Sequence, residues 1–376
     1  MRDSRNWCGR RLGDKPLRYW IIRRSLFVIL FLAQINKVEI KNKLYMGRPI
    51  AYLDQNVLDL FVKFGLFNSA TSLRSHFQVV YSDETLKEIK RSGKQADKFL
   101  TVLSELNSLH LRVLVDSNFQ ITDRATLTER DPFDAYIEYC ANEPVYEELQ
   151  RAMEQWLLKL YGGRRGDGIG DIRREQEVAF NELLDYLQQS VEQVKDVFPG
   201  IDTTIQVLNT YTRDRFENTL NDLELQLKSN IENDREWSGI KDYRNAVGIG
   251  PLELNNIKPP NVIQKIWKLY KTVRPYRDLA ITIDDFFGIA RNPIHPEQLL
   301  HKHQKITLMY GLLNSLGYFP DSKVHKERRF LTALSDQEHA SMASFTDHLF
   351  SRDANFVKKV EAVYEYLEIP TQVHFC

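Results

Sequence analysis

Short apolar runs alternate with amphipathic segments near the start of the chain. The runs are four to six residues long, which is the length of a buried strand. They lie at 50–53, 77–82 and 111–116. The other segments repeat apolar residues at the spacing of a helix with one buried face, and they lie at 57–64, 83–93 and 96–109. Strands that alternate with helices predict a parallel sheet.

The same alternation returns at the end of the chain. Two segments have helical spacing, at 298–318 and 357–367, and two runs are short enough for strands, at 348–351 and 370–375. A further helix is expected to begin at Asp336, because an acid after Ser335 suits the first turn of a helix. The two ends of the chain therefore predict one α/β domain.

The middle of the chain, 125–299, has a different pattern. It is mainly helical, and Pro199-Gly200 separates two long stretches of helical periodicity. Two helices joined by a short turn form an antiparallel hairpin. The flanking segments, 46–124 and 300–376, together number 156 residues, a normal size for one domain. We predict that a helical insertion interrupts the α/β domain and either covers its site or contacts a regulatory partner or a second copy of the chain.

The first 45 residues differ in composition from the rest. They contain 11 Lys and Arg against 3 Asp and Glu, and their apolar run at 26–33 has only eight residues. A membrane-spanning helix needs about 20 apolar residues, so this run does not predict a span. Signal peptides also place a basic region before an apolar run, but no small-residue cleavage site follows here. We favour a start at Met46, with 1–45 as a basic extension outside the fold.

Charge and cysteine content narrow the expected partners. The whole chain has 51 basic and 51 acidic residues, so the part after the basic extension is acidic overall. Contacts with nucleic acid must then come from local basic patches. The cysteines, Cys8, Cys140 and Cys376, have neither disulfide nor zinc-ligand spacing. This favours a reducing compartment, and we expect a cytoplasmic protein without membrane contact.

Two acidic residues come just after predicted buried strands. Asp54 follows the run at 50–53, and Asp353 lies just beyond the run at 348–351. In open α/β sheets, ligands bind outside the carboxyl ends of the strands. Burying an acid there without a partner would be costly, which favours a functional role. We therefore expect Asp54 and Asp353 to belong to a site.

Four short motifs resemble those of the PIN-like nuclease family. LDQNV at 53–57 is similar to the end of the family's first strand, with Asp54 as its acid. Glu88 in YSDETLKEI resembles the second acid. Asp336, followed by His339-Ala340, resembles the third, and Asp353 in LFSRDANF the fourth. The resemblance covers about 150 residues at the two ends of the chain. It implies a PIN-like parallel sheet flanked by helices and a metal-dependent endonuclease that hydrolyses RNA, or less often DNA.

Physical chemistry supports a cation among these acids. Four carboxylates at one edge of a sheet repel one another, and each resists ionisation beside the others. Mg²⁺ or Mn²⁺ relieves this repulsion, since both ions prefer oxygen ligands and activate bound water for attack on a phosphodiester. We expect Asp54 and Asp353 to bind the cation directly. Asp336 and Glu88 would bind it directly or through water.

Several of these residues have a second interpretation. Asp336 also suits a helix N-terminus, and Glu88 an exposed ion pair with Arg91. His339 either approaches a phosphate or packs inside its helix. Four candidates for contact with single-stranded RNA could equally be ordinary surface residues, although the first could orient Asp54 instead; they are Asn56, Arg352, Lys358 and Lys359.

Other acids near the motifs are expected to serve the fold alone. Asp83 suits the first turn of its helix, and Asp347 lies at the entry of a predicted strand. At the level of function, the alternative to a nuclease is a catalytically silent PIN-like scaffold that binds RNA or a protein partner. Four acids in the family's order favour the nuclease.

Overall fold

A computed structural model describes most of the chain after the predicted extension. The described residues are 47–65, 67–115, 121–142, 144–192, 201–229, 231–274, 276–292 and 299–376. The basic extension, 1–45, lies outside them, so its predicted independence of the fold stays a prediction.

Six strands of the described residues form one sheet in the order β4-β3-β2-β1-β5-β6. Neighbouring strands are parallel, apart from β3 and β4, which are antiparallel. The strands are β1 (Ile50–Leu53), β2 (Gln78–Tyr81), β3 (Leu109–Val115), β4 (Ile121–Thr128), β5 (His348–Ser351) and β6 (Gln372–Phe375). The prediction of an α/β fold with a parallel sheet is confirmed. The sequence pattern did not predict β4, whose residues are mostly half-exposed.

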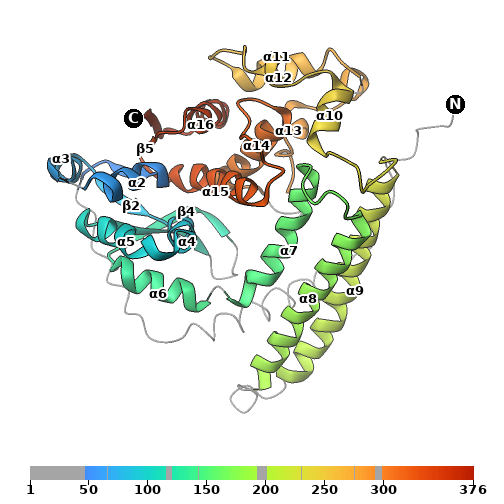
Figure 1. The fold of residues 1–376 in the computed structure, drawn as a ribbon, viewed down its shortest axis with the longest axis horizontal. Helices are drawn as coiled ribbons and strands as arrows, with labels where there is room; N and C mark the ends of the chain where they lie inside the picture. Colours follow the sequence, from blue (N-terminus) through green and yellow to red (C-terminus); the bar gives the residue numbers. More distant parts are fainter. Residues whose placement is uncertain are drawn as a thin grey trace.

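Helices cover both faces of this sheet because its strands are apolar on both sides. Leu53, Val79 and Tyr81 pack with α2 (Gln55–Phe64), α4 (Asp83–Arg91) and α5 (Ala96–Glu105). Tyr52 and Leu349 point to the other face and pack with α14 (Lys302–Leu316), α15 (Glu327–Ala343) and α16 (Ala354–Leu367). Figure 1 shows these two groups on either side of the strands. The short helix α3 (Phe67–His76) connects α2 to β2.

The helix that carries Asp336 begins earlier than the sequence predicted. It starts at Glu327, so Asp336 lies in its interior and the predicted start at Asp336 is wrong. The physical reason is that Phe330 and Ala333 are buried at helical spacing before Asp336 and extend the apolar face of the helix. Ser335 is buried within that helix and does not cap it.

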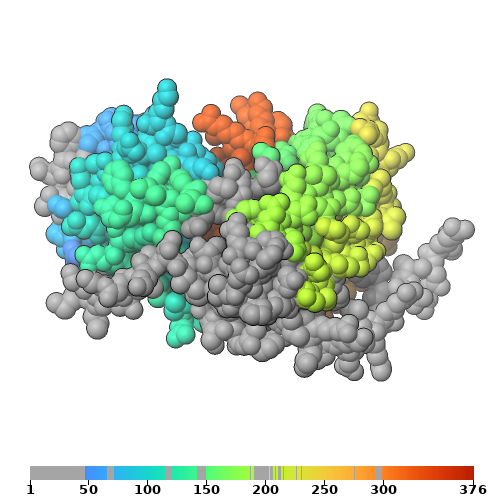
Figure 2. Space-filling view, turned by 90° about the horizontal axis from the view of Figure 1, so that it is seen from below, coloured from blue at the N-terminus to red at the C-terminus, as the bar shows by residue number. Residues whose placement is uncertain are grey.

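A long helical hairpin extends away from the sheet, as Figure 1 shows. It consists of α8 (Ile169–Glu192) and α9 (Ile201–Lys228), preceded by α6 (Pro132–Asn142) and α7 (Pro144–Leu160). The two long helices coincide with the predicted hairpin. At its base, Trp156, Ile169 and Ile172 form a small buried cluster. Seen from below, the α4–α6 region and the hairpin occupy opposite sides of the molecule (Figure 2).

The end of the predicted insertion packs on the helices α14 and α16 and belongs to the same apolar core. It contains α10 (Ile240–Val247), α11 (Pro251–Leu254), α12 (Val262–Tyr270) and α13 (Ile283–Phe286). Ile263 and Ile266 of α12 are fully buried in the same apolar cluster as Tyr52 of β1 and Leu349 of β5. One core therefore contains residues from 46–124, 125–299 and 300–376. The boundaries of a separate helical domain stay a prediction.

Candidate active site

The site is built where β1 and β5 end side by side. These strands are parallel neighbours, and Leu53 pairs with Phe350. Asp54 follows directly and is only 4% exposed. Although it stands at the N-cap position of α2, its carboxylate does not cap that helix. The Ser351 hydroxyl at the end of β5 donates to Asp54 Oδ2 over 2.6 Å, so residues 297 positions apart form one polar centre.

Asn56 holds the two strand ends together. Its Nδ2 donates to Asp54 Oδ2 and to Ser351 Oγ, the latter at 3.2 Å. Its Oδ1 accepts the backbone N–H of Arg352 over 2.8 Å. Both ends of the amide are therefore used within the protein. Of the two roles predicted for Asn56, this arrangement fits the orientation of Asp54.

A buried polar chain leads from β1 to Glu88. The Tyr52 hydroxyl lies 2.7 Å from His339 Nδ1 and 2.8 Å from Ser82 Oγ. His339 Nε2 lies 3.0 Å from Glu88 Oε2, and His339 is fully buried. Burial alone would lower the pKa of His339, but Tyr52 and Glu88 outweigh it and the pKa rises well above its ordinary value. His339 therefore forms an ion pair with Glu88 inside the protein.

Glu88 stays ionised for the complementary reason. Burial alone would raise the pKa of Glu88, but the positive charge of His339 outweighs this effect and the pKa is lowered. Arg91 contributes only a weaker attraction, and its guanidinium donates to the carbonyl of Leu331. The interpretation of Glu88 as an exposed partner of Arg91 is therefore wrong, because its carboxylate is turned inward to His339.

Burial and neighbouring acids raise the pKa values of both Asp54 and Asp336. Burial raises the pKa of Asp54, and the nearby charge of Glu88 raises it further, while His339 and the hydrogen bond from Ser351 only partly offset this. Burial raises the pKa of Asp336 well above its usual value, and Asp54 is the first of the neighbouring charges that raise it more. Because Asp54 and Glu88 both raise the pKa of Asp336, and Glu88 also raises that of Asp54, these acids share one electrostatic environment. The fold thus brings together Asp54, Glu88 and Asp336 from β1, α4 and α15.

Asp353 lies at the rim of this environment and has a structural task as well. It is the N-cap of α16, and its Oδ1 accepts from the backbone N–H groups of Asn355 at 2.8 Å and Phe356 at 3.0 Å. Its side chain is exposed. Of the two late acids, Asp353 is therefore the helix cap, and the predicted metal-binding roles of Asp336 and Asp353 stay predictions.

Sequence reasoning missed Asp321 and misread Lys359. Lys359 of α16 is fully buried, and its Nζ lies 2.8 Å from Asp321 Oδ1 and 4.4 Å from the centre of the Tyr310 ring. The charge of Asp321 raises the pKa of Asp336, whereas that of Lys359 lowers it. Lys359 lies three residues after the buried Phe356, on the inner face of α16, and this spacing was the available signal.

The pKa of Tyr310 also responds to the charges of these acids. It is fully buried on α14, and its hydroxyl has no hydrogen bond among the described residues. Burial raises the pKa of Tyr310 well above its usual value. Weaker contributions come from four surrounding carboxylates, which are, in order, Asp336, Asp321, Asp353 and Asp54. Asp353 is thereby placed in the same acidic environment as the inward acids.

Two nearby acids lie outside this cluster. Asp83 is exposed and pairs with His110 Nε2 over 2.8 Å. Asp347 lies at the opposite end of β5, where its Oδ2 accepts the backbone N–H of Ile50 over 2.7 Å. Both therefore stabilise the edges of elements, in keeping with the expected structural roles.

The carboxylate oxygens of the cluster are suitable ligands for a divalent cation, but the side chains are too far apart to bind one together. Oxygen atoms dominate the cluster, and Asp321 Oδ2 is buried without a hydrogen bond among the described residues, whereas Glu88 Oε2 already has its ion pair with His339. Within those residues, however, no three Asp, Glu, His or Cys side chains approach closely enough to hold a metal ion together. A cation would have to draw the acids inward or bind some of them through water.

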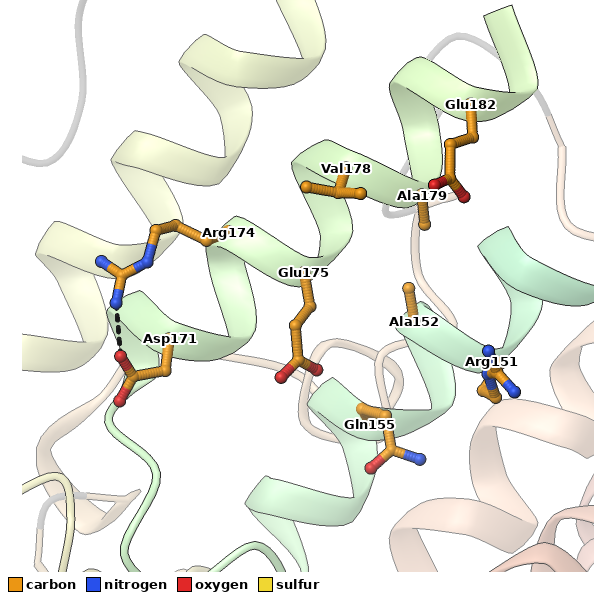
Figure 3. A pocket seen from close by; sticks show the side chains of 9 residues that line it. All are labelled: Arg151, Ala152, Gln155, Asp171, Arg174, Glu175, Val178, Ala179 and Glu182. Atoms are coloured by element: carbon orange, nitrogen blue, oxygen red, sulfur yellow. Dashed lines mark hydrogen bonds and ion pairs between the residues drawn. The ribbon is translucent and has the colours of Figure 1, made fainter. Parts of the chain in front are cut away.

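A separate groove lies between α7 and α8, and Figure 3 shows its lining. It has a volume of about 600 Å³, and none of the acids of the β1–β5 edge lines it. Arg174 pairs with Asp171, and both oxygens of Glu175 accept from the guanidinium of Arg164 at 2.6 and 2.7 Å. Because these charges already neutralise one another, the groove does not point to a charged ligand.

Comparisons with protein-family models, with curated proteins and with solved structures returned no match. Among the residues that the structure describes, no helix is both long enough and apolar enough to span a membrane.

Proposed function

We propose that the acidic cluster binds Mg²⁺ or Mn²⁺ and that the chain is a PIN-like endonuclease acting on single-stranded RNA. One observation carries the proposal: Asp54 is buried at the joined ends of β1 and β5, where the charge of Glu88 raises its pKa and the charges of both raise the pKa of Asp336. Proteins rarely bury several acids together without a compensating cation or a functional reason. The motif resemblance to PIN-like nucleases supports the same conclusion.

The residues of the cluster would have the following roles in metal binding. Asp54 and Asp336 would be direct ligands, with Glu88 and Asp353 binding directly or through water. When bound, the cation supplies charge neutralisation and a water activated for attack on phosphorus. Ser351 and Asn56 fix the orientation of Asp54, and supports of this kind tune metal sites strongly.

Other residues would hold the acids and the substrate. His339 holds Glu88, and Lys359 holds Asp321. Arg352 and Lys358 are exposed near the N-terminus of α16, where they would contact RNA phosphates. These two residues would form a local basic patch, because the chain after residue 45 is acidic overall.

The metal dependence of cleavage tests the proposed function. The full chain is incubated with labelled single-stranded RNA and with DNA of the same sequence, in Mn²⁺, in Mg²⁺ and in chelator. We expect cleavage inside the RNA with either metal, weaker cleavage of DNA, and none in chelator. Cleavage that persists in chelator would overturn the metal mechanism. RNA binding without cleavage in any metal would favour the silent scaffold.

A further inference from the structure

A second pocket opens between α16 and the end of the helical insertion. It has a volume of about 290 Å³, near the lower end of the range for small-ligand pockets. Its apolar lining includes Val262, Phe319 and Ala362, and its charged lining includes Lys258, Lys358 and Glu361. An apolar floor with a few charged groups is the usual composition of a ligand site.

The pocket adjoins the proposed metal site through the chain itself. Phe319 lies two residues before Asp321, and Lys358 comes directly before Lys359 on α16. Asp353 caps the same helix five residues earlier, a rise of about 7 Å along its axis. A strand held at the acidic site would therefore pass within reach of the pocket.

The aromatic wall is held in an unusual backbone conformation. Phe319 has φ 43°, in the left-handed region that bulky residues rarely adopt. Its backbone N–H donates to Asn255 Oδ1 over 2.7 Å, which anchors the loop to the end of α11. Gly317 has φ 109°, and a Cβ there would come 3.0 Å from the ring of Pro251. Strain of this kind persists where the surrounding contacts enforce it, and it is frequent at binding sites.

The charges of the pocket favour an uncharged ring with phosphates outside it. Lys358 Nζ lies over the Phe319 ring, 5.1 Å from its centre and at cation–π distance, so it must move off the ring toward a phosphate when a base stacks there. Glu361 and Glu365 also line the pocket, and the Glu365 carboxylate already accepts the backbone N–H of Asn261. Carboxylates would repel a phosphate inside the pocket, whereas Lys258 and Lys358 would attract phosphates at its mouth.

We propose that this pocket binds one unpaired nucleobase of the RNA, stacked on Phe319, next to the phosphate at the acidic site. The proposal rests on the proposed function and adds a source of selectivity. A base inside a duplex is already stacked and paired, so it enters the pocket only after costly unstacking. The pocket therefore selects single strands, and Lys358 and Lys258 hold the flanking phosphates.

Binding without cleavage tests the pocket separately from the chemistry. A single-stranded RNA carrying 2-aminopurine is titrated with the full chain in chelator, and affinity and base fluorescence are measured. We expect Phe319→Leu to weaken binding about tenfold, since base–aromatic stacking contributes strongly to such affinities. Phe319→Tyr should restore affinity and quenching. Phe64→Leu, at an exposed aromatic on α2, is the matched control and should bind like the wild type.

The outcomes separate the two proposals. Wild-type cleavage together with unchanged affinity in Phe319→Leu would overturn the pocket and leave the nuclease intact. Weakened binding in Phe319→Leu with restoration in Phe319→Tyr, but no cleavage by the wild type, would support the pocket and overturn the nuclease. Equal affinity for a fully paired duplex would also overturn the pocket. Circular dichroism of each variant establishes that the fold is retained.

Discussion

At the scale of single residues, Lys359 is the most exceptional group near the acids. A lysine is almost never fully buried without a partner, and here the partner is Asp321 at 2.8 Å. Its charge also counteracts the repulsion that Asp54 and Asp321 exert on Asp336. Without a bound metal, Lys359 and the buried His339 are thus two internal cations beside this group of carboxylates.

Removing that charge should destabilise the fold. Lys359→Met leaves Asp321 buried without its ion pair, and breaking one side of a buried pair costs about 3–5 kcal/mol. The double variant Lys359→Met, Asp321→Asn should recover part of this loss, because the second change removes the uncompensated charge. Urea unfolding of the wild type and both variants measures the difference. Equal midpoints for the wild type and Lys359→Met would contradict the role of the buried pair.

His303 gives the fold a dependence on pH. Burial and, less strongly, the neighbouring His301 lower its pKa to about 4, so His303 is neutral in the folded protein near pH 6. An unfolded histidine has a pKa near 6.5, so the unfolded chain binds an extra proton between these values. The contribution of His303 to stability should therefore be complete above about pH 6.5 and fall as the pH drops toward 4.

A substitution isolates this contribution. In His303→Leu, the loss of unfolding free energy between pH 6.5 and 4 should be smaller than in the wild type. His325→Leu, at an exposed position, should retain the wild-type slope. Urea unfolding at several pH values measures these slopes. Parallel profiles for His303→Leu and the wild type would contradict the assignment.

At the scale of elements, the local sequence pattern predicted those helices and strands that local interactions determine. β1, β2, β5 and α4 were predicted close to their observed bounds, because short apolar runs and helical periodicity specify them. The start of α15 was missed because Ser335-Asp336 has the composition of a cap while buried residues upstream continue the helix. A sequence motif for a cap does not reveal whether the preceding turn is already packed.

The candidate site, too, could be predicted from the sequence only in part. Asp54 and Asp353 could be found from sequence because each follows a strand, and parallel strand ends share one edge. The pairing of Lys359 with Asp321, and of His339 with Glu88, depends on how helices distant in sequence pack together. No local spacing encodes such contacts, so they emerged only from the fold.

At the scale of the whole molecule, the helical segment has two parts with different relations to the core. The α8–α9 hairpin extends away from the sheet (Figure 1), whereas Ile263 and Ile266 of α12 are buried in the apolar core that includes residues from both ends of the chain. The outer hairpin therefore contributes little to the apolar core around the sheet. The helices that follow it are part of that core.

Deletions should distinguish these two parts. Replacing 183–213 by a short Gly/Ser linker should leave a cooperatively folded protein, because the cluster at the base of the hairpin remains. Replacing all of 125–299 should abolish cooperative unfolding, since Ile263 and Ile266 are lost and the core is left incomplete. Circular dichroism melting of both variants measures this. Cooperative melting after the larger deletion would show that the two ends form a core alone.

The rate of Mn²⁺-dependent RNA cleavage in Asp54→Asn, compared with Asp347→Asn, tests the central claim most directly. The two changes each remove one carboxylate charge, at opposite ends of the β1–β5 pair, but only Asp54 belongs to the acidic cluster. The wild type and Asp347→Asn should cleave at comparable rates, whereas Asp54→Asn should lose activity by about a hundredfold or more while remaining folded. Equal rates in the wild type and Asp54→Asn would contradict the assignment of this cluster as a metal-dependent nuclease site.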